Sequence, residues 1–295
     1  MSCATRRASR HGGACKCRRR RTEFGWCLPD GYRLSTPSNG SVAAAELLRL
    51  DAGYRLACTT VISALRRVRR RFLPAHVRAD IRDTELLVAL LEERLEPDSD
   101  CLDVGAHAGS ILAAMVRHAP QGRHVAWEPL PAFAARLRER FPGVDVREAA
   151  LGNEAGERNF THVLDDPGWS GFVARPTPSS SAVEEIAVRV ERLDDVLPEG
   201  VQPVFVKIDV EGAEEEVLRG AQQTLRRHRP VVAFEHGRGS ADHYGTTPRG
   251  IHDLLGRDLG YEIYGLDGDG PYDAERFIEI FASGELVNFV ARPCA

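Results

Sequence analysis

The chain has 295 residues, of which 43% are hydrophobic and 28% are charged, and its formal net charge is −4. This composition is that of a globular protein, and the length suffices for one α/β domain with an extension. No run of 18 apolar residues occurs, so we expect no transmembrane helix. The seven cysteines include no C-x-x-C pair, which argues against a disulfide framework or a zinc site and favours a reduced, cytoplasmic protein.

Charge is distributed unevenly along the chain, because residues 1–78 carry 17 Lys and Arg but 4 Asp and Glu. Residues 1–40 are rich in Arg, Ser, Gly and Thr and predict a disordered basic tail. Residues 41–80 predict a basic helical extension, in which Val61, Leu65, Val68 and Phe72 share one face among arginines. This face either packs on the domain predicted for residues 81–295 or makes peripheral membrane contact through residues 61–72.

The segment Asp103-Val104-Gly105-Ala106-His107-Ala108-Gly109 joins a short buried strand to a helix. Glycine at a strand end lets the chain turn sharply, and the helix N-terminus then offers free N–H groups to a ligand. His107 stands where the dinucleotide fingerprint has its second glycine, which disfavours a pyrophosphate. We therefore predict S-adenosylmethionine as the ligand, bound by Gly105, His107 and Gly109, with Asp103 facing its ammonium group.

A second predicted strand ends in Glu128, 25 residues after Asp103. An acidic residue at about this spacing accepts hydrogen bonds from both ribose hydroxyls of a nucleotide. The alternative is that Glu128 only caps the helix that follows. Further on, residues 145–151 predict a third strand, and a long loop after Asp165 carries Trp169 and Phe172, which either cover an apolar acceptor or pack inside the domain.

Carboxylates follow the next two predicted strands. The apolar segment 204–208 runs into Asp209, Glu211 and Glu214, and the segment 230–234 runs into Glu235 and His236. Because the carboxyl ends of parallel strands meet at one edge of the sheet, these side chains are expected beside the glycine turn. Asp209, Glu211, Glu235 and His236 are then candidate bases for a hydroxyl acceptor.

Two other charged residues of this region have structural interpretations. Glu214, in the first turn of a helix, complements the helix dipole, and Lys207, inside the strand, pairs with one of the carboxylates. The clustered carboxylates also suit Mg²⁺ or Ca²⁺, so a divalent metal that orients the acceptor is a variant of the same site.

The segments D-V-G-A-H-A-G, K-I-D-V-E-G-A-E with the following V-L-R-G-A, and V-V-A-F-E-H resemble the FkbM family of methyltransferases, over roughly residues 84 to 292. The resemblance implies a Rossmann-like, doubly wound α/β fold with a seven-stranded sheet whose last strand is antiparallel. It implies O-methylation of a small molecule or sugar, and it places Ala149 and Ala150 near the adenine. The family usually has Asn where this chain has His107.

The sequence thus predicts a cytoplasmic S-adenosylmethionine-dependent methyltransferase that acts on a hydroxyl of a small molecule or sugar, with no nucleic-acid partner. An NAD(P)-type oxidoreductase would share the sheet and Glu128, although the second glycine is missing. A noncatalytic binding module would instead use the basic N-terminal extension and bind nucleic acid or anionic lipid in a salt-dependent manner.

Overall fold

The computed structural model describes residues 73–165, 167–174 and 182–294. The predicted tail and most of the predicted extension, including residues 61–72, lie outside these ranges. The first described helix, α2 (Ala75–Arg94), runs across the predicted domain boundary at residue 81. None of the helices in the described part has the length and hydropathy needed to cross a bilayer.

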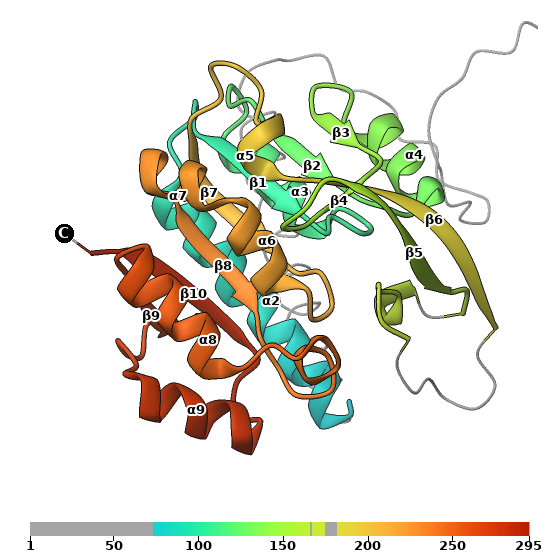
Figure 1. The fold of residues 1–295 in the computed structure, drawn as a ribbon. Coiled ribbons are helices and arrows are strands. Elements are labelled where there is room, and N and C mark those ends of the chain that lie inside the picture. Colours follow the sequence, from blue (N-terminus) through green and yellow to red (C-terminus); the bar gives the residue numbers. More distant parts are fainter. Residues whose placement is uncertain (1–72, 166, 175–181, 295) are drawn as a thin grey trace, which may run out of the picture. The chain divides into compact units, whose positions relative to one another are not determined.

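Seven strands form the larger sheet, in the order β3-β2-β1-β7-β8-β10-β9 (Figure 1). The strands are β1 (Asp100–Val104), β2 (Val125–Trp127), β3 (Asp145–Arg147), β7 (Pro203–Ile208), β8 (Val231–Glu235), β9 (Tyr261–Gly265) and β10 (Asn288–Pro293). The parallel strands are neighbours in the order β3-β2-β1-β7-β8. Strand β10 is antiparallel to both β8 and β9. The predicted doubly wound α/β fold with an antiparallel last strand is confirmed.

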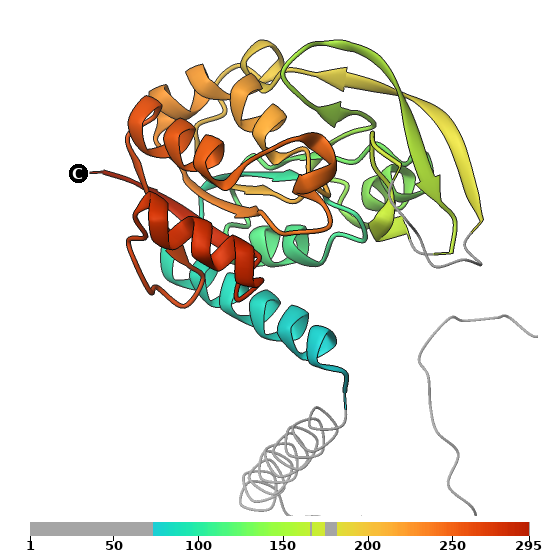
Figure 2. The ribbon, with the colours of Figure 1, turned by 60° about the horizontal axis from the view of Figure 1, so that its bottom comes forward.

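Helices cover both faces of this sheet, because its strands are apolar on both sides. The first core packs the sheet against α6 (Glu214–Gly220), α7 (Gln222–His228), α8 (Pro248–Asp253) and α9 (Ala274–Ser283). The second core packs it against α2, α3 (Ser110–His118) and α4 (Pro131–Arg140). Figure 2 shows α6, α7 and α8 on one side of the strands and α2 and α3 on the other. Strand β1 serves both cores, since Leu102 faces the first and Cys101 the second.

A smaller sheet, β4-β6-β5, was not expected from the sequence. It contains β4 (Ala150–Leu151), β5 (Gly156–Val163) and β6 (Val183–Glu191), which is followed by α5 (Leu193–Val196). Figure 1 shows the long β5–β6 ribbon projecting from the larger sheet. The predicted single strand over residues 145–151 is therefore wrong: Val146 packs with α4 in the second core, but Ala150 packs with Phe160 and Val188 in a third, separate core.

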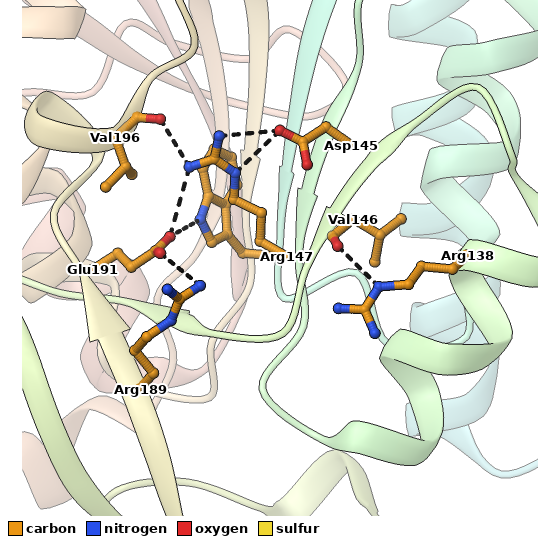
Figure 3. A network of polar contacts seen from close by, with 8 residues as sticks. Arg138, Asp145, Val146, Arg147, Arg189, Glu191 and Val196 are labelled. Carbon is orange, nitrogen blue, oxygen red and sulfur yellow. Dashed lines mark hydrogen bonds and ion pairs between the residues drawn. The ribbon is translucent and has the colours of Figure 1, made fainter.

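Polar contacts join the two sheets, and Figure 3 shows them from close by. The indole N–H of Trp127, on β2, donates to Glu191 of β6 at 2.9 Å. Arg147, on β3, lies 3.8 Å from the same carboxylate, and its guanidinium carbon is 5.5 Å from the Trp127 ring centroid. Arg189 completes the group with an ion pair to Glu191 at 2.8 Å. The fully buried Trp127 ring is thereby held at the junction of the sheets.

Candidate active site

The carboxyl ends of the central strands meet at one edge of the larger sheet, as predicted. Gly105 follows β1, Glu128 follows β2, Asp209 follows β7, and Glu235 ends β8. The strand register sets this arrangement, because Val104 pairs with both Trp127 and Ile208, and Ile208 pairs with Phe234.

The glycine turn brings two loops unusually close together. Gly105 has a φ of +78°, and a Cβ at this position would lie 1.9 Å from the Asp209 carbonyl oxygen. His107 also has a positive φ, of 47°, and its backbone N–H donates to Glu128 at 2.7 Å. The centroid of the His107 ring lies 4.4 Å from the centroid of the Phe133 ring. The turn is therefore fixed by Glu128 on one side and by the β7 loop on the other.

The first cavity, of about 130 Å³, opens between this turn and the smaller sheet. Its polar end holds Glu128, whose second oxygen accepts the backbone N–H of Leu130 at 2.9 Å. Burial raises the pKa of Glu128, and the two backbone hydrogen bonds oppose that shift. Both carboxylate oxygens retain a further lone pair for a ligand. Apolar walls come from Leu130, Ala149, Ala150, Phe160 and Phe172.

The second cavity is a larger cleft of about 1020 Å³. Its walls include Lys207, Glu235, Arg238 and His243, together with His76, Asp80 and Thr84 of α2. It shares Gly105, His107, Gly168, Asp209 and Glu211 with the first cavity. The α2 wall was missed in the sequence analysis, although the four-residue spacing of its three polar residues is a signal for one exposed helix face.

Three carboxylates gather where the cavities meet. Oxygen atoms of Asp209, Glu211 and Glu235 all lie within 4.8 Å of one another. Burial, reinforced by the other carboxylates, raises the pKa of Glu235 well above its usual value. Burial also acts to raise the pKa of Asp209, but the charge of Lys207 and a hydrogen bond with Glu235 hold it below its usual value. Of the two carboxyl groups, Glu235 therefore holds a proton more tightly than Asp209 does.

The structure places three of the predicted site residues outside both cavities. Asp103 is 1% exposed, and its charged neighbour is Lys207, whose Nζ lies 3.4 Å from Asp103 Oδ1. Gly109 has a packing role, because a Cβ there would lie 2.6 Å from Leu137 and 2.8 Å from Phe141.

His236 is the third of these residues. Its ring is fully buried and stacks on Phe277 and Phe281, with centroid distances of 5.8 Å and 4.8 Å. Burial lowers its pKa to about 4, so the ring is neutral at ordinary pH. The structure does not bring His236 to the carboxylate cluster, because strand alternation directs it into the core while Glu235 faces the cleft.

The chain is similar to a family and to individual proteins of known kind. A family model, the methyltransferase FkbM domain, matches residues 103–263. The 2-O-methyltransferase NoeI of Sinorhizobium fredii is 31% identical over 160 residues, a match that covers 48% of this chain and 64% of NoeI. The hexuronic acid methyltransferase AglP of Haloferax volcanii is 28% identical over 200 residues, covering 65% of this chain and 77% of AglP.

Among solved structures, the methyltransferase FkbM from Methylobacillus flagellatus is 17% identical, with a TM-score of 0.42, and the match covers 68% of this chain and 44% of that one. The chain spans less than two thirds of the length of NoeI. The family model covers more than half of the chain and includes the glycine turn, Glu128 and the carboxylate cluster. The chain therefore belongs to the FkbM methyltransferase family.

Proposed function

We propose that this protein transfers the methyl group of S-adenosylmethionine to a hydroxyl group of a small molecule or sugar. One observation carries the proposal: Asp209 and Glu211 line both cavities, so the carboxylates stand between a small, largely apolar cavity and an open cleft. Family membership supports methyl transfer, and the names of NoeI and AglP support a hydroxyl or sugar acceptor.

The first cavity fits the adenosine half of the cofactor. Glu128 offers acceptor oxygens for the two ribose hydroxyls, and the side chains of Leu130, Phe160 and Phe172 form apolar walls suited to adenine. Ala149 and Ala150 lie on the same wall, and we assign them to the adenine side of the cavity. When bound, the cofactor supplies an electrophilic methyl group on a positively charged sulfur. The carboxylate cluster at the edge of this cavity would attract that charge.

The acceptor hydroxyl has to lose a proton as its oxygen attacks the methyl carbon. We assign the general base to Glu235, because its raised pKa makes it a stronger base than Asp209 once it is ionised. Asp209, hydrogen-bonded to Glu235 and 3.3 Å from Lys207 Nζ, orients the pair. Glu211 lines the cleft beside them and helps to position the acceptor.

The proposal is tested by calorimetric titration of S-adenosylmethionine, and separately of NADH, into the full chain and into Glu128→Ala. We expect S-adenosylmethionine to bind and its dissociation constant to rise at least about tenfold in the variant, since hydrogen bonds to two hydroxyls are lost. Glu139→Ala, an exposed glutamate on α4, is the matched control and should bind as the wild type does. Binding of NADH alone would favour the oxidoreductase alternative. Absence of both, with salt-dependent binding of nucleic acid or anionic lipid, would favour the binding module.

A divalent cation held by Asp209, Glu211 and Glu235 is the alternative role for the same cluster. Three oxygens within 4.8 Å suit Mg²⁺, whereas Lys207 already neutralises part of the cluster. Titration of Mg²⁺ alone into the protein distinguishes the two roles. We expect no saturable heat; saturable heat that disappears in Glu235→Gln would assign the cluster to a metal.

We propose a cytoplasmic location, supported by the free thiols of Cys101 and Cys294. Peripheral membrane contact through residues 61–72 stays a prediction, which binding of the full chain to anionic vesicles would test.

A further inference from the structure

Tyr244 connects two loops that are far apart in the sequence. It ends the short helix η2 (Ala241–Tyr244), which follows β8 on the side of the cleft. Its hydroxyl oxygen accepts the backbone N–H of Phe172 at 2.8 Å and that of Val173 at 3.3 Å. A hydroxyl oxygen has two lone pairs, so both bonds form at once.

Two glycines make room for the tyrosine. A Cβ on Gly171 would lie 2.8 Å from the Tyr244 hydroxyl oxygen. A Cβ on Gly212 would lie 2.8 Å from Tyr244 Cδ2 and 2.6 Å from the backbone of Ser240. All three distances are shorter than the contacts of a real Cβ atom allow. The side chain of Tyr244 thus lies between the loop of Gly171 and the loop of Gly212, in contact with both.

Each of these loops belongs to the proposed active site. The loop 167–173, which we call the roof loop, includes η1 (Pro167–Trp169). Its Ser170 and Phe172 line the first cavity, its Trp169 lines the cleft, and Gly168 lines both. The loop of Gly212 follows β7 and carries Asp209 and Glu211.

The buried side chain of Glu214 holds the Gly212 loop in place. Glu214 accepts the backbone N–H groups of Val210 and Gly212, each at 3.1 Å. The Phe172 ring, in turn, makes an edge-to-face contact with Phe160 at 5.2 Å. Tyr244 is therefore placed between an anchored catalytic loop and a roof whose aromatic ring faces the first cavity.

We propose that Tyr244 is a positioning residue that holds the roof loop over the bound cofactor and in register with the catalytic carboxylates. Release of the roof loop opens the first cavity without removing any side chain that lines it. The cofactor in this statement rests on the proposed function, whereas the hold on the roof loop does not.

Tyr244→Phe tests the inference, since it removes both hydrogen bonds and keeps the ring. Hydrogen exchange is followed by mass spectrometry on peptides that cover residues 167–174, and binding of S-adenosylmethionine and S-adenosylhomocysteine by calorimetry and stopped flow. We expect the Phe172 and Val173 amides to exchange at least about tenfold faster. Both ligands should bind about tenfold more weakly through faster dissociation, with the melting temperature nearly unchanged. A general structural role would instead lower the melting temperature.

Tyr264→Phe is the matched control, because the exposed Tyr264 hydroxyl donates to Glu262 at 2.8 Å, away from both cavities. Gly171→Ala displaces the Tyr244 hydroxyl by another route and carries the test if Tyr244→Phe fails to fold. Unchanged exchange in the roof loop would overturn the inference, and so would faster exchange with unchanged cofactor affinity. If the wild type bound no S-adenosylmethionine, the proposed function would fail. The hydrogen-exchange measurement alone would then test whether Tyr244 holds the roof loop.

Discussion

The ammonium of Lys207 lies 3.4 Å from the carboxylate of Asp103, and their side chains are only 9% and 1% exposed. The two residues are direct register partners on β7 and β1. The same ammonium donates to the Gly105 carbonyl at 2.6 Å and lies 3.3 Å from Asp209. Burial acts to lower the pKa of Lys207, but Asp209 and Asp103 outweigh it, so the amine stays charged. One cation thus joins both strands, the glycine turn and the catalytic loop.

Lys207→Met should destabilise the protein by about 3–5 kcal/mol, because it leaves the charge of Asp103 buried without a partner. The free energy of unfolding in urea measures this effect. The double variant Asp103→Asn with Lys207→Met should recover part of the loss. Arg257→Met, which breaks an exposed ion pair with Asp253, is the control and should change stability by at most about 1 kcal/mol. A Lys207→Met variant as stable as this control would refute the interpretation.

Gly105→Ala should lower the free energy of unfolding by about 2–4 kcal/mol. The added carbon meets the Asp209 carbonyl oxygen, and the positive φ is strained for alanine. It should also weaken cofactor binding, because the β7 loop has to move. Gly143→Ala is the comparison, as a Cβ there meets nothing within 4 Å. Thermal unfolding and calorimetric titration of both variants provide the measurement. Equal stability and equal cofactor affinity of the two variants would show that the close approach of Gly105 to Asp209 contributes to neither.

Binding of S-adenosylmethionine should release up to about one proton, because a cation beside the carboxylate cluster lowers the raised pKa of Glu235. The binding enthalpy then depends on the ionisation enthalpy of the buffer, and affinity increases with pH through the range where Glu235 titrates. S-adenosylhomocysteine lacks the charge on sulfur and should release fewer protons. Glu235→Gln should remove the buffer dependence; its persistence in that variant would place the proton on another group.

Glu214 should make the protein less stable as pH rises. It is 1% exposed, and burial raises its pKa from 4.5 to about 7, so the folded state binds a proton more tightly than the unfolded state does. Its contribution is fully present below about pH 4.5 and is lost as pH rises through about 7, a change of roughly 3 kcal/mol at most.

Glu214→Gln keeps an acceptor for the two backbone N–H groups and should reduce the difference in unfolding free energy between about pH 5 and about pH 8. Urea midpoints at both pH values measure it. Glu279→Gln, on the exposed side of α9, should keep the wild-type difference. If Glu214→Gln kept the same difference as well, the titrating group would lie elsewhere.

The residue pattern predicted four strands of the larger sheet and the residues at their carboxyl ends, whereas the seven-strand count came from the family resemblance. Apolar runs that end in Gly105, Glu128, Asp209 and Glu235 are local signals, and parallel pairing then brings their ends to one edge. The smaller sheet was not predictable in the same way. Its edge strand β5, with the sequence GERNFTHV, has two buried residues among eight, and it lacks the apolar run by which buried strands are recognised.

The apolar pattern also does not show in which direction a polar side chain next to it points. His236 directly follows Glu235, and Asp103 directly precedes Val104. Neighbouring residues of an extended chain point to opposite faces, so the side chains of His236 and Asp103 turn into the protein. Tyr244 shows a different limit. Its hydrogen bonds span more than 70 residues, so nothing near it in the sequence indicates its partners.

The position of β10 also determines which strand edges are unpaired while the chain is being synthesised. Residues 288–293 insert between β8 and β9, although both of those strands leave the ribosome earlier. Until β10 arrives, the facing edges of β8 and β9 carry unpaired backbone groups that can pair with other chains. A nascent chain stopped before residue 288 would therefore contain the glycine turn and all three carboxylates and still present two aggregation-prone edges.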